Sequence, residues 1–195
     1  MAERKVLEAA LDGLYVKIVR VGNLMARYDD GLFQKNYDTN AFLSNIKSIK
    51  NLQVISDSMY NAKIEMSPID FTAKSIIALA KTPSQCSVFN CQNNNFLYTK
   101  DIIEALNSLG NNIKCVSDKE FFEICMENLD ENIQGLITSD NSMDDSELSA
   151  DASEVNVNIT QTVDILKKLG FIWPKPDSYY LKRFILKMQE CHDFF

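Results

Sequence analysis

The side chains best suited to nucleophilic or metal chemistry in this sequence are five cysteines and one histidine. Cys86, Cys91, Cys115, Cys125 and Cys191 show no Cys-x-x-Cys spacing, and His192 stands alone near the C-terminus. A catalytic Cys–His pair would have to use His192, whose neighbour Cys191 points elsewhere. Zinc needs four nitrogen or sulfur ligands, which this spacing does not offer. We therefore predict reduced thiols buried as small apolar groups, with no metal ligand and no catalytic residue in this chain.

The positions of glycine and tyrosine decide whether the chain can bind a dinucleotide by itself. A dinucleotide-binding turn needs closely spaced glycines, so that backbone amides at a helix N-terminus reach the pyrophosphate. The six glycines are each at least nine positions apart. No tyrosine is followed four residues later by lysine, the pair in which a tyrosine of lowered pKa supplies a proton to a carbonyl oxygen. The sequence therefore lacks both the pyrophosphate clamp and the proton donor.

The composition is that of a soluble globular chain. Its 195 residues are 46% hydrophobic, which is enough for one sizeable core or two small ones. The formal net charge of −7 repels phosphate backbones and anionic lipid. No apolar stretch approaches the roughly 18 residues of a membrane span, and the N-terminus is charged rather than signal-like. We predict a cytoplasmic protein with neither a nucleic-acid partner nor a membrane partner.

The first half of the chain predicts alternating helices and strands. Residues 2–12 have helical spacing but no N-cap, and residues 14–21 are β-branched and end at Gly22 and Asn23, as a strand does. A loop and a helix within residues 40–55 follow, then a short strand over 64–67. Asp70 is the expected N-cap of the next helix. The apolar face expected on that helix consists of Ala73, Ile76, Ile77 and Ala80.

The second half repeats strand and helix signals. Residues 87–91 predict a strand, and Thr99 is the expected cap of a helix that ends at Gly110. Residues 113–116 predict another strand, and Ser117 with Glu120 forms a capping box for the helix that follows. Thr160 is expected to cap a helix that ends at Gly170. A last helix over 178–190 is expected to bury Leu181, Phe184, Ile185 and Met188.

An acidic, Ser- and Asn-rich segment separates residues 138 and 158. No basic residue lies between Lys119 and Lys167, and apolar anchors are few. This composition predicts a flexible acidic linker or insertion over 139–157. The alternative is a calcium-binding loop, which needs alternating oxygen ligands around a turn-forming glycine. Residues 140–151 contain no glycine, which disfavours that alternative.

Several blocks, in the same order along the chain, resemble terminal thioester reductase domains of nonribosomal peptide synthetases. These domains belong to the extended short-chain dehydrogenase/reductase family. The first block is Arg20-Val21-Gly22-Asn23-Leu24, extending to Tyr28. The others are residues 40–42, residues 66–76 from Met-Ser-Pro-Ile-Asp, the strand around Val88 and Phe89, and residues 169–174 with Leu-Gly-Phe-Ile-Trp-Pro. Each block alone is weak, but five in register are unlikely to coincide by chance.

The resemblance implies an α/β fold, α+β if the fragment stands alone, that corresponds to the C-terminal substrate-binding portion of an extended short-chain dehydrogenase. Ala2 and Glu3 are similar to the tail of the family's catalytic Tyr-x-x-x-Lys helix, which would place the missing motifs upstream. Residues 1–23 would be the end of that helix and the following Rossmann strand, and 24–138 a substrate-binding region with returning strand–helix units. Residues 139–157 would be the acidic linker, and 158–195 the C-terminal helices of a mostly helical subdomain.

The resemblance also implies an activity: reductive release, with NADPH or NADH, of a peptidyl or acyl thioester as an aldehyde or alcohol. The expected partners are the upstream Rossmann half and a peptidyl carrier protein with its phosphopantetheine arm. Gly22 and Asn23 are the candidates for contacts to the cofactor or to the edge of the substrate, the alternative being a structural turn after a strand. The candidates for the acyl and pantetheine channel are Arg27, Phe33, Phe42 and Met66, whose alternative is ordinary packing or surface placement.

A second hypothesis comes from a different functional class. The chain could be a non-catalytic α+β module that docks a carrier protein and performs no chemistry. Under the first hypothesis the isolated chain neither binds NADPH tightly nor oxidises it, because the clamp and the proton donor are elsewhere. Under the second hypothesis, even a longer polypeptide that contains this chain would not reduce a thioester.

Overall fold

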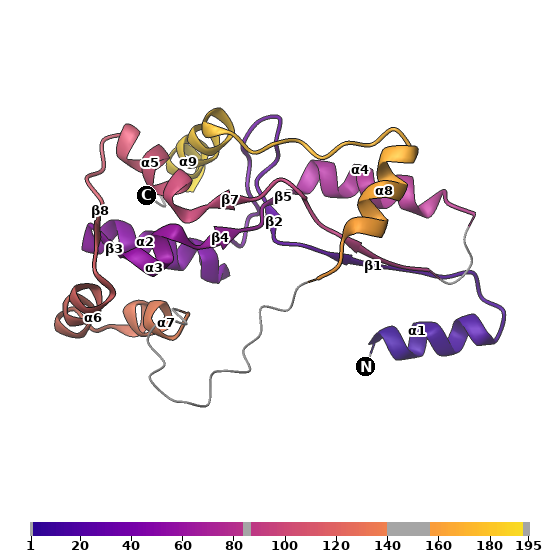
Figure 1. Cartoon of the computed structure of the whole chain (residues 1–195), viewed down its shortest axis with the longest axis horizontal. Helices are drawn as coiled ribbons and strands as arrows, with labels where there is room; N and C mark the ends of the chain where they lie inside the picture. Colours follow the sequence, from indigo (N-terminus) through magenta and orange to yellow (C-terminus); the bar gives the residue numbers. More distant parts are fainter. Residues whose placement is uncertain (1, 84–86, 140–156, 193–195) are drawn as a thin grey trace. The chain divides into compact units, whose positions relative to one another are not determined.

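The structure is a computed structural model that describes residues 2–83, 87–139 and 157–192 (Figure 1). The chain divides into two compact units, each built from three separate stretches. The first unit comprises residues 1–29, 65–96 and 155–175, and the second comprises 30–64, 97–154 and 176–195. The segments predicted from the sequence are each one continuous stretch of chain, unlike these two units. The roles assigned to those segments stay predictions. Helices combined with short, mostly parallel strand pairs confirm the α/β class.

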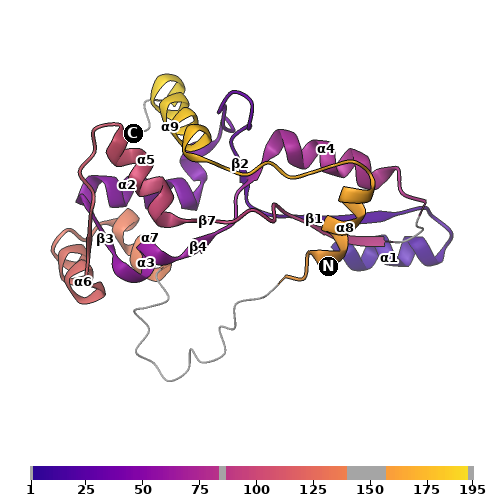
Figure 2. The same ribbon diagram turned by 45° about the horizontal axis from the view of Figure 1, so that its top comes forward.

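The first unit is organised around one pair of parallel strands. β1 (Lys17–Val21) runs parallel to β6 (Ser87–Cys91), in a register that pairs Lys17 with Ser87 and Val21 with Cys91. β2 (Leu24–Met25) pairs in parallel with β5 (Ser67–Pro68). The helices of this unit are α1 (Ala2–Leu11), α4 (Ile69–Ala80) and α8 (Thr160–Lys168). α4 and α8 both pack beside β6, as two views show (Figures 1 and 2).

A small apolar core joins these helices to the strand pair. Its buried members are Leu79, Phe89, Cys91, Leu166 and Trp173. They come from α4, β6, α8 and the segment after α8, so the core holds together residues that are up to 94 positions apart in the chain (173 − 79). Burial of each large apolar side chain contributes about 1.5–3 kcal/mol.

The second unit is mostly helical. Its helices are η1 (Tyr37–Thr39), α2 (Ala41–Leu52), α3 (Asp57–Asn61), α5 (Thr99–Ser108), α6 (Asp118–Glu127), α7 (Glu131–Ser139) and α9 (Ser178–His192). β3 (Val54–Ser56) and β8 (Lys114–Val116) pair in parallel, and β4 (Lys63–Ile64) and β7 (Leu97–Tyr98) pair antiparallel. Each of these two pairings joins strands that are distant in the chain.

Several helix predictions are confirmed. The helix expected within residues 40–55 is α2, and its cap, which was not predicted, is Asn40, whose Oδ1 accepts a hydrogen bond from the Leu43 amide at 3.0 Å. Ser117 caps α6 by accepting from the Glu120 amide at 3.3 Å. In α9 the four residues expected on the apolar face, Leu181, Phe184, Ile185 and Met188, are all at most 2% exposed. Helical spacing therefore located these elements correctly.

The predicted apolar face of α4 is wrong. Thr72, Ser75 and Leu79 are the buried side chains of this helix, whereas Ile76 and Ile77 are 37% and 58% exposed. The two buried hydroxyls are satisfied within the helix, because Thr72 Oγ1 donates to Pro68 O at 3.0 Å and Ser75 Oγ donates to Thr72 O at 2.7 Å. Small residues with satisfied hydroxyls can therefore occupy the inward face.

Three predicted N-caps are also wrong, because each residue lies one or two positions inside its helix. Pro68, Tyr98 and Ile159 occupy the cap positions of α4, α5 and α8. Asp70 instead accepts a hydrogen bond from the Tyr28 amide at 2.9 Å. Thr99 donates its hydroxyl proton to Ala62 O at 3.4 Å. Thr160 is the first residue of α8. Tertiary contacts, rather than local capping, use the first two side chains.

The strand boundaries differ from those expected. β1 begins at Lys17 because its pairing with β6 begins there, and Leu14 and Tyr15 are 61% and 54% exposed. The strand expected over 64–67 is two short strands, β4 and β5, with different partners. β2, β3, β7, α3 and α7 were not predicted. Most of the acidic segment lies outside the described residues, so its linker and calcium-loop interpretations stay predictions.

No helix in the described ranges is both long enough and apolar enough to cross a membrane. The same ranges contain no group of three or more His, Cys, Asp or Glu side chains arranged to hold a metal ion. None of the described cysteines, Cys91, Cys115 and Cys125, forms a disulfide with another described residue. Cys91 and Cys125 are buried as expected, whereas the expectation is wrong for Cys115 in β8, which is exposed.

Candidate functional site at the carboxyl ends of β1 and β6

A turn formed by Gly22 and Asn23 follows β1 directly. Because β1 and β6 are parallel, their carboxyl ends meet at the same edge of the pair, and the Gly22 amide donates to Cys91 O at 3.3 Å. In open α/β sheets, ligands bind outside the carboxyl ends of the strands. The Gly22/Asn23 turn therefore lies at the edge where ligands bind in such sheets, and the ligand contacts expected of these two residues stay predictions.

The side chain that organises this edge is Glu65, which precedes β5. Its Oε2 accepts a hydrogen bond from the Asn23 amide at 2.6 Å. Its Oε1 accepts from the Ser67 hydroxyl and, at 3.1 Å, from the Asn93 amide. The Asn23 side-chain Nδ2 also donates to Glu65 O at 3.3 Å. One carboxyl group therefore joins the segments that follow β1 and β6 to the start of β5.

Burial raises the pKa of Glu65 above its usual range, because the low-dielectric surroundings penalise the charged form. The hydrogen bonds from Ser67, Asn23 and Asn93 favour the charged form and oppose that effect without cancelling it. Burial also raises the pKa of the Cys91 thiol, and the nearby Glu65 carboxylate raises it further. This edge of the first unit thus holds an acid and a thiol that both favour their neutral forms more than in water.

Gly22 is required by space rather than by backbone conformation. The glycines with positive φ in the described residues are Gly13, Gly31, Gly110 and Gly170. A Cβ at position 22 would lie 2.3 Å from Glu65 Oε2 and 2.6 Å from Gln92 Cβ. Both separations are far below contact distance. Glycine at this position therefore allows the Glu65 carboxylate to reach the backbone of the turn.

Asn93 anchors the same network from the core side. It is completely buried, and its Nδ2 donates to Met66 O at 3.0 Å and to Pro174 O at 3.1 Å. Its Oδ1 accepts from the Asn95 amide at 2.9 Å. Because a buried amide must satisfy its donors and acceptor, Asn93 fixes the loop after β6 to β5 and to the segment after α8.

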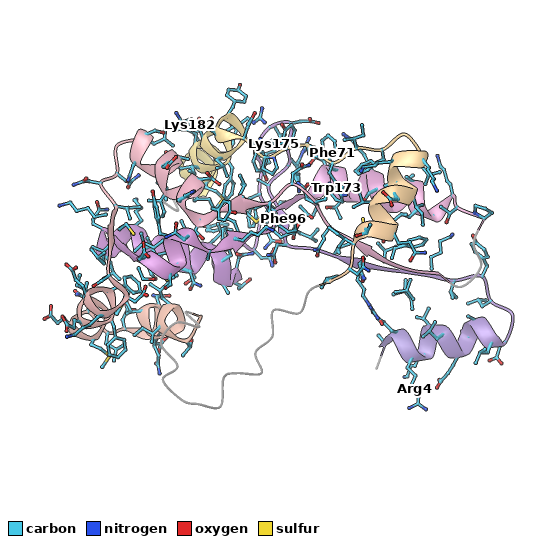
Figure 3. All side chains as sticks on the ribbon, in the orientation of Figure 1. Arg4, Phe71, Phe96, Trp173, Lys175 and Lys182 are labelled. Atoms are coloured by element: carbon cyan, nitrogen blue, oxygen red, sulfur yellow. The ribbon has the colours of Figure 1, made fainter. Side chains whose placement is uncertain are left out.

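A small pocket lies beside this network within the first unit. Its volume is about 150 Å³. The lining residues are Asn94, Asn95, Val163, Leu166, Lys167, Phe171, Ile172, Trp173 and Lys175. Aromatic side chains continue from it, with Phe171 packed edge-on against Trp173 at 5.2 Å and against Phe71 at 6.2 Å between ring centroids; Figure 3 labels Phe71, Trp173 and Lys175. The pocket is smaller than most ligand sites, which measure roughly 300–1,000 Å³.

The six residues selected from the sequence fall in both units. Gly22, Asn23, Arg27 and Met66 belong to the first unit, and Phe33 and Phe42 belong to the second. Asn23 and Arg27 are exposed, whereas Met66 is only 1% exposed. Gly22, Asn23 and Met66 lie around the Glu65 and Asn93 network described above.

The two phenylalanines selected from the sequence are half-buried. Phe33 packs against Phe184 with ring centroids 5.7 Å apart, and Phe42 lies in the first turn of α2. Sequence reasoning missed Glu65, Ser67 and Asn93. A glutamate within a short apolar strand signal was the one hint available, because a charged residue in such a place needs partners.

No family model matches the sequence, and a search of the curated proteins finds no match either. Among solved structures, a thiolation-reductase di-domain from an archaeal nonribosomal peptide synthetase is 52% identical, with a TM-score of 0.88, and the match covers 100% of this chain and 40% of that one. The reductase domain of the Aureusimine biosynthetic cluster is 26% identical with a TM-score of 0.76, and the match covers 96% of this chain and 48% of that one.

The terminal R domain of the myxalamid PKS-NRPS pathway is 16% identical, and its TM-score of 0.73 over 98% of this chain and 48% of that one reports likeness of fold. The fold is thus that of part of an extended short-chain dehydrogenase/reductase. Within that class, the chain matches the C-terminal part of the reductase domains of nonribosomal peptide synthetases. The resemblance inferred from the Arg20 to Leu24 block and the later blocks is confirmed. The chain spans less than half the length of each of these relatives.

Proposed function

We propose that the chain is the substrate-side part of an NAD(P)H-dependent thioester reductase. This reductase releases a carrier-bound peptidyl or acyl thioester as an aldehyde or alcohol. The observation that carries the proposal is the 52% identity, over the entire chain, to part of a protein described as a thiolation-reductase di-domain. A match at that identity over the whole chain makes the relative the best guide to the chemistry of this chain.

The chain's own residues fit only the nicotinamide side of the cofactor. The sequence has no glycine-rich turn for the pyrophosphate and no Tyr-x-x-x-Lys pair, so another polypeptide segment must provide them. The Gly22/Asn23 turn, at the carboxyl ends of parallel strands, would meet the reacting end of the cofactor. NADPH, when bound, supplies the hydride. This chain would orient the thioester carbonyl and exclude water from it.

The acyl and pantetheine channel is proposed to use Arg27, Phe33, Phe42 and Met66. Arg27 is exposed and offers planar donors to carbonyl or phosphate oxygens, and the two half-buried phenylalanines offer apolar contact area. Met66 is buried and would contribute an apolar thioether side chain. The proposed partners are the upstream Rossmann half and a carrier protein that bears phosphopantetheine, in the cytoplasm.

The test compares this chain with the complete reductase that contains it. Both proteins are incubated with NADPH and a carrier-bound acyl thioester, and NADPH absorbance and the released aldehyde are measured. We expect the complete reductase to consume NADPH and form aldehyde, and this chain alone to do neither. The free acid, which lacks the thioester, is the control substrate and should not be reduced.

Two outcomes would contradict the proposal. Turnover of NADPH by this chain alone would show that it contains a catalytic apparatus absent from our interpretation. A complete protein that binds the loaded carrier but leaves NADPH unconsumed would favour the non-catalytic docking module instead.

A further inference from the structure

We propose that Glu65 is a positioning residue of the reductase, whose carboxylate holds the Gly22/Asn23 turn at the carboxyl end of β1 in the geometry that the ligand requires. This inference rests on the proposed function and deepens it. Glu65 lies 42 positions after Asn23 and 28 before Asn93, yet its two carboxyl oxygens reach both backbones.

The contacts of Glu65 require a carboxylate rather than merely a polar side chain. The groups that face its two oxygens are the Asn23 amide, the Asn93 amide and the Ser67 hydroxyl, and all three act as donors. An ionised carboxylate accepts at both oxygens and donates nothing. A glutamine of the same shape would direct an NH₂ group at one of these donors. These three donors favour the charged form, and they oppose the burial that raises the pKa of Glu65.

Glu65 and its neighbours also fix the orientation of the Asn23 side chain. Asn23 Nδ2 donates to Glu65 O at 3.3 Å, and Asn23 O accepts from the Ser67 amide at 2.9 Å. Because a backbone carbonyl can only accept, the Nδ2 atom of Asn23 must face it, which assigns the amide orientation. The Oδ1 of Asn23 lies outside these bonds.

Gly22 completes the arrangement. Its missing Cβ leaves the space that Glu65 Oε2 occupies, so the glycine and the glutamate form one structural unit. The Glu65 network also reaches the core through Asn93, whose side-chain Nδ2 donates to Met66 O and to Pro174 O. The turn is thus held on a rigid support, which is the arrangement that accurate positioning of a reacting group demands.

The first test detects the hydrogen bonds from the Asn23 and Asn93 amides to the Glu65 carboxyl group and needs no enzyme activity. Amide protons that donate to a carboxylate move with its ionisation, so NMR spectra of the chain are recorded from about pH 4 to about pH 8. We expect the Asn23 and Asn93 amide protons to shift together with one midpoint, and to lose this shift in Glu65→Gln. Cys91 is the other titratable group here whose pKa Glu65 influences, and Cys91→Ala should leave the midpoint visible. If the Asn23 and Asn93 amide shifts of the unmodified chain do not change with pH, the proposal that Glu65 holds the turn is wrong.

The second test measures the reaction in the complete reductase. Glu65→Gln should lower kcat/KM by about tenfold or more, because small misplacements of reacting groups are costly. Glu127→Gln makes the same chemical change at an exposed position of α6 and should stay within about twofold. Glu65→Asp, which keeps the charge but shortens the reach, should recover part of the loss.

The outcomes of the two tests separate the two proposals. If the unmodified reductase reduces no thioester, the proposed function fails, and the amide titration alone decides whether Glu65 holds the turn. If the unmodified enzyme is active and Glu65→Gln matches it in kcat and KM, then Glu65 has no positioning role. Loss of activity in Glu65→Gln with an unchanged Asn23 amide signal would equally overturn the mechanism proposed for it.

Discussion

Gly22 and Glu65 are packed so closely that a methyl group on Gly22 would lie 2.3 Å from the Glu65 carboxylate oxygen Oε2. The two residues are 43 positions apart in the chain. Their proximity explains why a glycine without positive φ stands at the end of β1, and it makes the carboxyl end of that strand dependent on a side chain from another segment.

The first prediction concerns this pair. Gly22→Ala should destabilise the chain by about 1–3 kcal/mol, the usual cost of overpacking, because Gln92 Cβ at 2.6 Å cannot swing aside as the end of Glu65 can. Gly135→Ala is the control: position 135 lies in α7 with open space around it, and alanine there should stabilise by roughly 0.5–1 kcal/mol. Denaturant unfolding measures both variants. Equal stabilities would contradict the packing described here.

The second prediction concerns pH. Burial raises the pKa of Glu65 above 4.5 in the folded chain, so the folded chain holds this proton more tightly than the unfolded chain does. The stabilisation from Glu65 is therefore complete below the unfolded-state pKa and is lost as pH rises through the folded-state pKa. The unfolding free energy of the unmodified chain, relative to Glu65→Gln, should fall across that interval. A difference that grows with pH would mean that the hydrogen bonds outweigh burial.

The third prediction compares two positions of α4 that sequence periodicity does not distinguish correctly. Leu79 is completely buried and Ile77 is 58% exposed. Leu79→Ala should cost about 2–5 kcal/mol through lost burial and a cavity. Ile77→Ala should change stability by about 0.5 kcal/mol or less. Thermal and denaturant unfolding report both values, and the reverse ranking would restore the face expected from the sequence.

The fourth prediction concerns Gly31 in the second unit. Its φ is +75°, and a Cβ there would lie 2.8 Å from the backbone oxygen of Arg183. Gly110, with φ of +101°, has open space around it, so a substitution there measures the cost of the positive φ alone. Gly110→Ala should cost about 1–2 kcal/mol. Gly31→Ala should cost roughly 1–3 kcal/mol more, since a backbone atom cannot move away easily. Similar losses of unfolding free energy in the two variants would show that the Arg183 backbone moves aside at little cost.

The sequence by itself determined features that depend on neighbours along the chain. α9 is an example, because the spacing of Leu181, Phe184, Ile185 and Met188 follows the helical repeat and all four are buried. The cap at Ser117 is another, since it accepts a hydrogen bond from an amide three residues ahead. The reductase resemblance also came from short contiguous blocks, which is why it was visible without coordinates.

Tertiary structure alone decided which side chains meet. Periodicity assigned Ile76 and Ile77 to the inner face of α4, but Thr72 and Ser75 occupy that face, where their hydroxyls find acceptors within the helix. The contacts of Glu65 with Asn23 and Asn93 depend on the parallel pairing of β1 with β6, which brings the segments after both strands to the same edge. Contacts between residues so far apart leave no local pattern, because chain folding rather than sequence spacing sets their separation.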